Sequence, residues 1–171
     1  MAADRNQGWR EAALTGLVER HRTALVRMCC LCLGDASLAE DAAQETFLKA
    51  YRALDSFRGE CDEKTWLMRI AINTCRDMRR SRWTRHVDRR VTPEMLPEAS
   101  APFEERDEEL TLAVMRLPPK QREAVLLRYY QRMSLAQAAQ AMGVTVSTVS
   151  RQLGRALRSL RGILEGGREH E

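Results

Sequence analysis

A stripe of hydroxyl and guanidinium side chains between Ser147 and Arg158 is the part of this chain best suited to chemistry with DNA. An arginine can donate two hydrogen bonds to the edge of a guanine, and a serine or threonine can bind a base edge or a phosphate. The members of the stripe recur at the spacing of one helix face. They are Ser147, Thr148, Ser150, Arg151, Arg155 and Arg158.

The segments around this stripe predict a helix-turn-helix over residues 134–158. Ser134 and Gln137 form a capping box at the start of a first, alanine-rich helix. Gly143 stands where the chain must turn, because glycine adopts positive φ at little cost, and Thr145 can cap the second helix. A plain amphipathic hairpin is the alternative, but caps, turn and polar stripe all favour the helix-turn-helix. The apolar face of the second helix is predicted to consist of Val146, Val149, Leu153, Ala156, Leu157 and Leu160.

The net charge of +4 conceals two basic blocks on either side of an acidic segment. Residues 64–90 hold nine basic side chains against two acids, and residues 116–168 hold ten against Glu123 and Glu165. Between them, residues 88–109 hold eight acids against three arginines. Two separated basic blocks predict a polyanionic partner.

The five cysteines stand at positions 29, 30, 32, 61 and 75, and the three in the Cys-Cys-Leu-Cys run, at 29, 30 and 32, are predicted to be buried thiols. Their odd number and uneven spacing argue against a disulfide framework. Three of them fall within one predicted helix without a spaced second pair, whereas zinc sites use paired ligands. A thiol or metal enzyme is the alternative, but there are three histidines and neither a P-loop nor a His-Glu-x-x-His motif. The sequence therefore predicts no enzyme activity, no catalytic residue, no metal and no cofactor.

Hydropathy gives no indication of a membrane protein. No apolar run approaches the roughly 20 residues that span a bilayer, and no signal peptide is recognised. We expect a soluble, cytoplasmic protein without membrane insertion.

Three helices are predicted in the first half of the chain, over residues 9–33, 37–54 and 64–83, after about ten frayed residues. Gly34 ends the first helix, and Ser37 with Glu40 forms a capping box for the second. Apolar residues at helical spacing allow the three helices to bury one another. We predict that residues 10–90 form one independent domain.

Prolines and acids interrupt the helical pattern after this domain and predict a flexible linker over residues 91–103. A helix over 104–116 and another over 120–130, which follows Pro118 and Pro119, then lead into the helix-turn-helix. The second domain is predicted over residues 104–165. The fold class is therefore all-α, with two small helical domains joined by a flexible linker and a helix-turn-helix in the C-terminal one.

Two segments resemble conserved regions of bacterial sigma factors, in the same order along the chain. Similarity to the fourth conserved region lies in the segment LPPKQREAVLLRYYQRMSLAQAAQAMGVTVSTVSRQLGRALRSLR. Similarity to the second conserved region lies in the segment LAEDAAQETFLKAYRALDSFRGECDEKTWLMRIAINTCRDMRR. The linker is too short to hold a third region. In this respect the chain resembles the extracytoplasmic-function (ECF) group of the sigma-70 family. The resemblance covers about residues 12–90 and 106–163. It implies a protein that binds core RNA polymerase, directs promoter-specific initiation and helps to melt the DNA.

The resemblance implies that the second helix docks on the coiled-coil of the largest polymerase subunit, and the flap of the polymerase is a further implied partner. Asp41, Gln44 and Glu45 share one helix face, and Leu48 adds an apolar contact. The alternative is structural: Asp41 favours the helix N-terminus, and Glu45 pairs with Lys49.

The loop around residue 58 and the helix after it are implied to read the minus-ten element. Melted DNA exposes bases that can stack on aromatic rings, with cations along the backbone. Trp66 falls on the apolar face and is assigned to the core, whereas Trp83 lies among arginines. The implied contacts are Phe57, Arg58, Gly59, Arg69, Asn73, Arg76, Arg79, Arg80 and Trp83.

The helix-turn-helix is implied to read the minus-thirty-five element, with backbone contacts from the start of the helix at residue 120. Ser150 and Gln152 stand beside Arg151 where many relatives carry basic residues, which leaves open the bases that are read. The implied contacts are Lys120, Arg122, Ser147, Thr148, Arg151, Arg155 and Arg158.

An anti-sigma factor is a further partner that the resemblance implies. The rival hypothesis is a stand-alone helix-turn-helix regulator that binds duplex DNA without polymerase. That hypothesis explains the C-terminal domain and leaves the N-terminal domain without a role.

Overall fold

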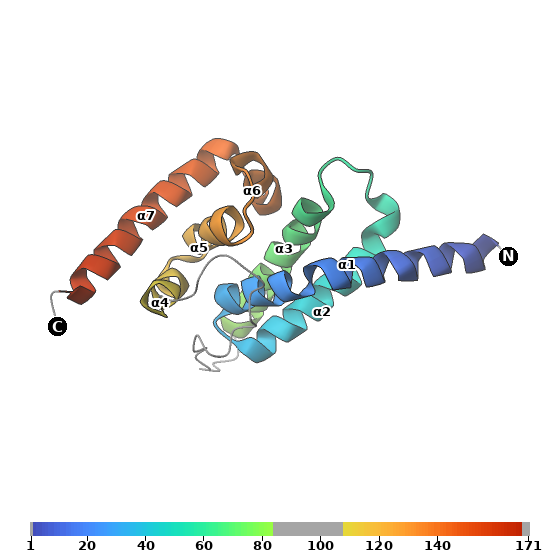
Figure 1. The fold of residues 1–171 in the computed structure, drawn as a ribbon, viewed down its shortest axis with the longest axis horizontal. Helices are drawn as coiled ribbons and strands as arrows, with labels where there is room; N and C mark the ends of the chain where they lie inside the picture. Colours follow the sequence, from blue (N-terminus) through green and yellow to red (C-terminus); the bar gives the residue numbers. More distant parts are fainter. Residues whose placement is uncertain (1, 84–107, 169–171) are drawn as a thin grey trace.

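The computed structural model describes the backbone of residues 2–83 and 108–168, and the side chains of residues 6–81 and 108–166 (Figure 1). All regular elements in these ranges are helical, which confirms the predicted fold class. The predicted linker over residues 91–103 lies outside the described residues. None of the described helices is both long and apolar enough to cross a membrane.

The first helix, α1 (Ala2–Leu33), is longer than predicted. The prediction of ten frayed residues was wrong, because this polar segment contains no helix breaker except Gly8, and Gln7 donates a hydrogen bond to Glu11 one turn later. The helix ends where predicted, at Gly34, whose φ of +67° is readily adopted by glycine.

The second helix, α2 (Ala36–Ala53), begins at a different cap from the one predicted. The side chain of Asp35 accepts a hydrogen bond from the backbone amide of Leu38, and the predicted cap Ser37 is exposed within the first turn. Asp35 takes this place because it directly follows Gly34, where the chain has already turned. A short 3₁₀ turn, η1 (Leu54–Ser56), follows the helix.

The third helix, α3 (Glu63–Trp83), is capped by the preceding residue Asp62, which accepts hydrogen bonds from both the backbone amide and the hydroxyl of Thr65. Helices α1, α2 and α3 pack on one another as an N-terminal helical group. The buried apolar side chains of this group include Leu17, Leu25, Met28, Phe47, Ala50, Leu67, Ala71 and Ile72.

The C-terminal helical group consists of α4 (Glu108–Arg116), α5 (Pro119–Val125), the π-helical turn η3 (Leu126–Tyr130), α6 (Leu135–Met142) and α7 (Val146–Arg168). Helix α5 begins at Pro119, one residue before the predicted start at Lys120, and this proline lies in the first helical turn as predicted.

The helix-turn-helix formed by α6 and α7 follows the predicted signals closely. Ser134 and Gln137 exchange both hydrogen bonds of a capping box, and Gly143 is left-handed with φ of +68°. The hydroxyl of Thr145 accepts a hydrogen bond from the amide of Thr148 at 3.3 Å and so caps α7. These signals are local in sequence, and therefore the sequence alone could reveal them.

The buried face of α7 is narrower than predicted. Val149, Leu153 and Leu160 are buried against α4, α5 and α6, together with Ala156. Val146 and Leu157, which were predicted on the same apolar face, are nearly half exposed. The neighbouring helices cover α7 from one side only, so that residues at the edges of the apolar strip remain in water.

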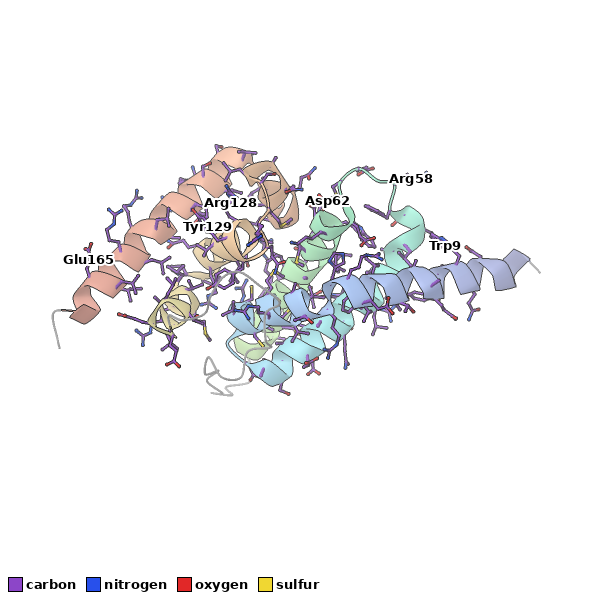
Figure 2. All side chains as sticks on the ribbon, viewed as in Figure 1. Trp9, Arg58, Asp62, Arg128, Tyr129 and Glu165 are labelled. Atoms are coloured by element: carbon purple, nitrogen blue, oxygen red, sulfur yellow. The ribbon has the colours of Figure 1, made fainter. Side chains whose placement is uncertain are left out.

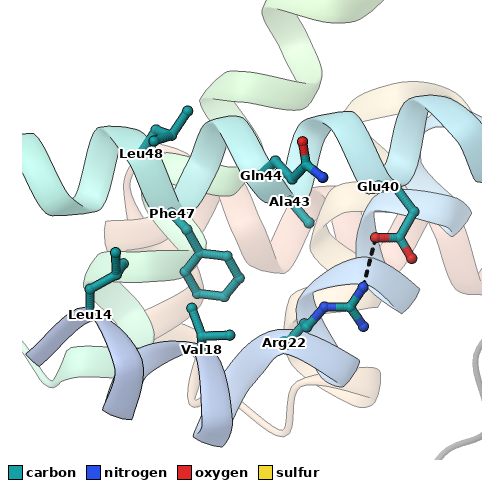
Figure 3. A pocket seen from close by; sticks show the side chains of 8 residues that line it. All are labelled: Leu14, Val18, Arg22, Glu40, Ala43, Gln44, Phe47 and Leu48. Atoms are coloured by element: carbon teal, nitrogen blue, oxygen red, sulfur yellow. Dashed lines mark hydrogen bonds and ion pairs between the residues drawn. The ribbon is translucent and has the colours of Figure 1, made fainter. Parts of the chain in front are cut away.

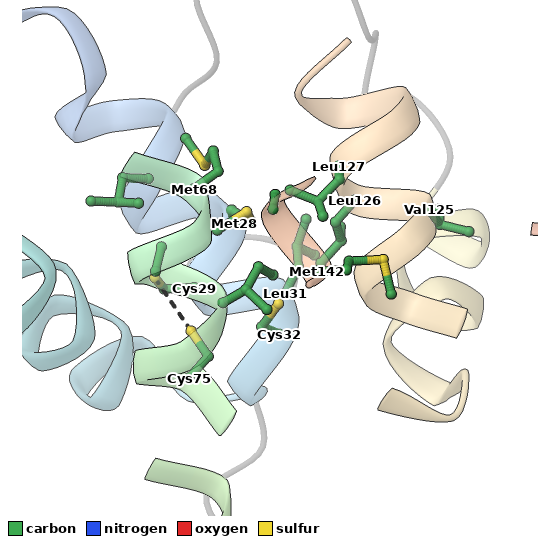
Figure 4. Packing of buried hydrophobic residues seen from close by; sticks show 14 of the residues in the cluster. Met28, Cys29, Leu31, Cys32, Met68, Cys75, Val125, Leu126, Leu127 and Met142 are labelled. Atoms are coloured by element: carbon green, nitrogen blue, oxygen red, sulfur yellow. Dashed lines mark hydrogen bonds between the residues drawn. The ribbon is translucent and has the colours of Figure 1, made fainter. Parts of the chain in front are cut away.

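The two helical groups share one continuous hydrophobic core, which the prediction of independent domains did not anticipate. Figure 4 shows Leu31 and Cys32 of α1 facing Leu126 and Met142 of the C-terminal group. Figure 1 shows the same arrangement, with α5 and α6 lying against the N-terminal group and α7 on the outer side. The C-terminal group is therefore docked on α1 and α3.

The cysteines are free thiols, and all except Cys61 are buried. Cys29 and Cys75 lie between α1 and α3 with 3.6 Å between their Sγ atoms. Burial raises the pKa of the Cys30 thiol to about 11, which keeps it protonated and unreactive near neutral pH. Cys29, Cys30 and Cys32 fill space in the core, as predicted, and Cys75 does so as well.

Candidate functional site

The polar stripe of α7 lies on the face that the other helices leave uncovered. Ser147, Arg151, Arg155 and Arg158 are exposed, and Thr148 is half-buried. The helix start is held in place by hydroxyl contacts, since Thr145 Oγ1 lies 2.9 Å from Thr148 Oγ1. The structure thus places these five predicted contacts together on one outward-facing strip of a capped helix.

The loop over residues 57–62 places two predicted contacts in solvent and one against the protein. Arg58 and Gly59 are exposed, and Figure 2 shows Arg58 at the end of the N-terminal group. Phe57 stacks on Trp66, with ring centroids 4.7 Å apart and an angle of 29° between the planes. Trp66 itself is half-buried and packs against the core, which agrees with its predicted assignment.

Helix α3 divides its predicted DNA contacts between two environments. Arg69, Asn73 and Arg80 are exposed, and Arg80 also binds Asp77 one turn before it. Trp83 lies in the last turn of α3, and its side chain is outside the described residues.

Arg76 and Arg79 are instead held at the junction of the two helical groups by Glu123 of α5. Nη2 of Arg76 donates to Glu123 Oε2 at 2.7 Å, and Nη2 of Arg79 donates to Oε1. The carboxylate is 1% exposed, so that both arginines are bound to a buried anion and not presented to DNA. This contact with Glu123 also raises the pKa of Arg76.

Arg122 was predicted to contact the minus-thirty-five element, but it is also bound within the protein. Its Nη1 atom donates to the carbonyl oxygen of Cys32 at 2.8 Å, and Nη2 donates to that of Leu117 at 2.9 Å. The side chain therefore satisfies carbonyl groups at the end of α1, where a helix has unpaired acceptors. Lys120, the other predicted contact on α5, is exposed.

Further polar contacts join the two groups on the side of Asp62. Gln137 of the capping box donates from Nε2 to Asp62 Oδ2 at 3.0 Å, and Figure 2 shows Asp62 at the start of α3. Lys64 Nζ donates to the carbonyl oxygen of Gln131 at 2.6 Å, and Gln131 in turn donates to that of Ala24. The junction is therefore polar at several separate points around an apolar centre.

The predicted polymerase-binding face of α2 is open. Asp41, Gln44 and Leu48 are exposed and Glu45 is half-exposed, with Leu48 exposing 48% of its surface. Lys49, the alternative partner of Glu45, extends instead toward α3 and donates to the hydroxyl of Thr74 at 3.2 Å. The carboxylates on this face are thus available to a basic partner.

A groove of about 360 Å³ runs beside this face between α1 and α2 (Figure 3). Leu14, Val18 and Phe47 supply its apolar floor, and the ion pair between Arg22 and Glu40 closes one end at 3.0 Å. Gln44 and Leu48 belong both to the groove and to the predicted docking face. Acidic, amide and apolar groups therefore form one continuous surface.

Three residues with a clear structural role were not predicted: Asp62, Glu123 and Gln131. One feature of the sequence could have indicated the structural role of Glu123, because it is one of only two acids in the basic C-terminal block. An isolated acid among cations in an apolar run is a candidate for a buried ion pair. Nothing local marks Gln131, because its partner Ala24 is 107 positions away.

The structure shows no metal-binding arrangement in the parts of the chain that it describes, since no three potential ligands there converge.

Comparison with protein families identifies both helical groups. Residues 17–85 match the model of Sigma-70 region 2, and residues 107–160 match that of Sigma-70, region 4. The chain is 33% identical to the RNA polymerase sigma-H factor of Pseudomonas aeruginosa, over 82% of this chain and 80% of that protein. It is also 33% identical to the ECF RNA polymerase sigma factor SigL of Mycobacterium tuberculosis, over 91% of each.

Solved structures show the same fold. The chain superposes on CnrH, solved in complex with the cytosolic domain of CnrY, with a TM-score of 0.67 and 25% identity over 91% of this chain and 90% of that one. The sigma factor RpoE of Bartonella quintana gives a TM-score of 0.70 at 24% identity, over 88% of this chain and 97% of that one. With two family regions in order and relatives of matching length, this chain belongs to the sigma-70 family, as an ECF RNA polymerase sigma factor.

Proposed function

We propose that this chain binds core RNA polymerase through α2, directs it to promoters with two recognition elements, and acts on DNA in the cytoplasm under the control of an anti-sigma protein. The observation that carries the proposal is the uncovered stripe of α7. A capped helix that presents three arginines and two hydroxyl side chains outward, on a helix-turn-helix, has the form of a major-groove reader.

The exposed surfaces indicate which residues are proposed to bind the polymerase and which to bind promoter DNA. Asp41, Gln44, Glu45 and Leu48 are proposed to dock on the polymerase, since this face offers acids around an apolar side chain. Arg58, Arg69, Asn73 and Arg80 are proposed to meet the minus-ten element.

On the C-terminal group, Arg151 and Arg155 are proposed to read bases of the minus-thirty-five element, while Arg158 and Lys120 contact phosphates. CnrH was solved in complex with the cytosolic domain of CnrY, and this complex supports the proposal that this chain also binds a regulatory protein partner.

The affinity of the full chain for core RNA polymerase tests the proposal. Titration of labelled chain with core enzyme, in the absence of DNA, is expected to give saturable binding of one chain per polymerase. A stand-alone regulator would fail to bind polymerase and would bind a duplex operator by itself.

A further inference from the structure

We propose that Arg10 of α1 is a positioning residue for the loop over residues 57–62, and that it holds this loop where Arg58 can select bases of the minus-ten element. The inference rests on the function proposed above, because that function assigns Arg58 to this element. Arg10 lies on a different helix from the loop, and its role requires no contact with DNA.

The guanidinium group of Arg10 holds the end of α2 at three points. Its Nη2 atom donates a hydrogen bond to the carbonyl oxygen of Tyr51 at 2.9 Å, and its Nη1 atom lies 3.4 Å from Oδ2 of Asp55. Its Cζ atom also lies 4.7 Å from the centroid of the Tyr51 ring, in a cation–π contact. Tyr51 belongs to the last turns of α2 and Asp55 to η1, so that one rigid side chain fixes both elements against α1.

The turn η1 leads directly into the loop that carries Arg58. The backbone amide of Phe57 donates to the carbonyl oxygens of Ala53 and Leu54, both at 3.2 Å, and so ties the first residue of the loop to the turn. Arg58 is the next residue, and Gly59 after it has φ of +72°. The orientation of η1 therefore determines where Arg58 leaves the surface of the protein.

The far end of the loop is fixed independently by the cap of α3. Asp62 accepts hydrogen bonds from the backbone amide of Thr65 at 2.9 Å and from its hydroxyl at 2.6 Å. Between the two fixed ends Arg58 is exposed, and Figure 2 shows it at the same end of the molecule as Trp9, the residue before Arg10. Selective contacts need donors held to within about 0.5 Å by their supporting residues. The contacts of Arg10 supply this support at the near end of the loop.

Two substitutions break the same contact from opposite sides. Arg10→Gln removes the guanidinium group, and Asp55→Asn removes the anion that it binds. Because both changes act on one interaction, their effects are not additive in the double variant. Arg52→Gln is the matched control, since Arg52 is an exposed arginine in the last turn of α2 and the change in charge is the same. Arg58→Ala identifies the promoter positions that the loop reads.

Each full-length variant is combined with core RNA polymerase and a promoter library whose minus-ten element is randomised. A transcribed tag identifies every template, so that sequencing of the transcripts gives the preference for each base at each position. We expect Arg10→Gln and Asp55→Asn to lower the preference by about fivefold at the positions that Arg58→Ala affects. The double variant is expected to lower it no further, and Arg52→Gln is expected to keep the wild-type preference.

A role of Arg10 in stability alone gives a different result. Variants that only unfold more easily lose transcription equally from all templates, and the base preference of the remaining transcripts stays that of the wild type. Unchanged preference in Arg10→Gln and Asp55→Asn therefore overturns the proposal, and so does an equal change in Arg52→Gln. Circular dichroism monitors folding, and the exposed Asp55→Asn decides by the same criterion if Arg10→Gln loses helix content.

The Arg58→Ala variant separates this inference from the proposed function. A base preference that changes in Arg58→Ala but not in Arg10→Gln contradicts the positioning role and leaves the assignment of Arg58 in place. A base preference that Arg58→Ala leaves unchanged contradicts the assignment of Arg58 to the minus-ten element, and the positioning role with it.

Discussion

The carboxylate of Glu123 lies 2.7 Å from Nη2 of Arg76, although 47 positions separate the two residues in the sequence. Glu123 belongs to the region-4 part of the chain and Arg76 to the region-2 part. This ion pair therefore joins the two halves of the molecule, through an arginine that the family resemblance had implied as a contact to the minus-ten element.

The α2 face gives the first prediction. Glu45→Lys places a cation where the proposed partner requires an acid, and we expect affinity for core polymerase to fall by about tenfold. The free energy of unfolding is expected to change by less than about 0.5 kcal/mol, because the side chain is on the surface. Glu19→Lys, which makes the same charge change on exposed α1, is expected to leave polymerase binding intact. Unchanged affinity in Glu45→Lys would remove α2 from the docking surface.

The recognition helix gives the second prediction. Loss of a bidentate arginine contact costs about 1–3 kcal/mol of discrimination at one base pair. Arg151→Ala is therefore expected to relax sequence preference at one position of the minus-thirty-five element, in transcription from a randomised promoter library. Arg161→Ala, one of the exposed arginines further along α7, is expected to weaken binding equally for all sequences and to lower the salt dependence. Identical behaviour of the two variants would place Arg151 on the phosphate backbone.

The turn of the helix-turn-helix gives the third prediction, which concerns stability. Gly143 has φ of +68°, and an alanine there is expected to lower the free energy of unfolding by about 1–2 kcal/mol. Gly154 lies inside α7, where the nearest atom to an added Cβ is Nη1 of Arg158 at 4.0 Å. Gly154→Ala is expected to raise the free energy of unfolding by about 0.5–1 kcal/mol. Urea denaturation followed by circular dichroism measures both, and equal signs would contradict the assigned turn.

The cap of α3 gives the fourth prediction, on pH. Burial raises the pKa of the Asp62 carboxyl, but hydrogen bonds from Thr65 and Gln137 outweigh it and hold the pKa below its ordinary value. Because the pKa of Asp62 is lower in the folded protein than in the unfolded chain, its ionised carboxylate stabilises the fold. This stabilisation is fully present above the ordinary carboxyl pKa of about 3.9 and is lost as the pH falls through the pKa of the folded protein.

Asp62→Ala is therefore expected to cost about 1 kcal/mol at pH 7, which is a fall of about 2–4 °C in melting temperature. The difference from wild type is expected to shrink steadily as the pH is lowered below about 4. Asp62→Asn, which can still cap the helix, is expected to retain most of the stability at pH 7. Thermal melts of the three proteins across this pH range make the comparison, and a pH-independent difference would show that the charge of Asp62 is not involved.

Local signals made much of the fold predictable. The capping box of Ser134 and Gln137, the turn at Gly143 and the cap at Thr145 were predicted correctly, because each depends on residues within a few positions. The cap of α2 was predicted wrongly at Ser37, since two residues with capping side chains stand close together and only the backbone geometry distinguishes them. Asp35 has the extended conformation that a cap requires.

The junction between the two halves could not be predicted in the same way. Arg76, Arg79 and Arg122 have the composition of a DNA-binding surface, and nothing in their sequence neighbourhood shows that Glu123 and the carbonyl groups of α1 occupy them. These contacts depend on how the two helical groups meet, across 44 to 90 positions of sequence. Residue type predicted what the side chains can bind, and the fold determined what they bind in this state.

Transcription with purified core RNA polymerase on a pool of genomic DNA fragments, with and without this chain, tests the central claim most directly. The account predicts defined start sites that require the chain, with two shared upstream elements in the aligned sequences. Glu45→Lys is predicted to suppress these start sites, and Glu19→Lys to leave them in place. Start sites that are the same with and without the chain, together with specific duplex binding by the chain alone, would contradict the account and support a stand-alone regulator.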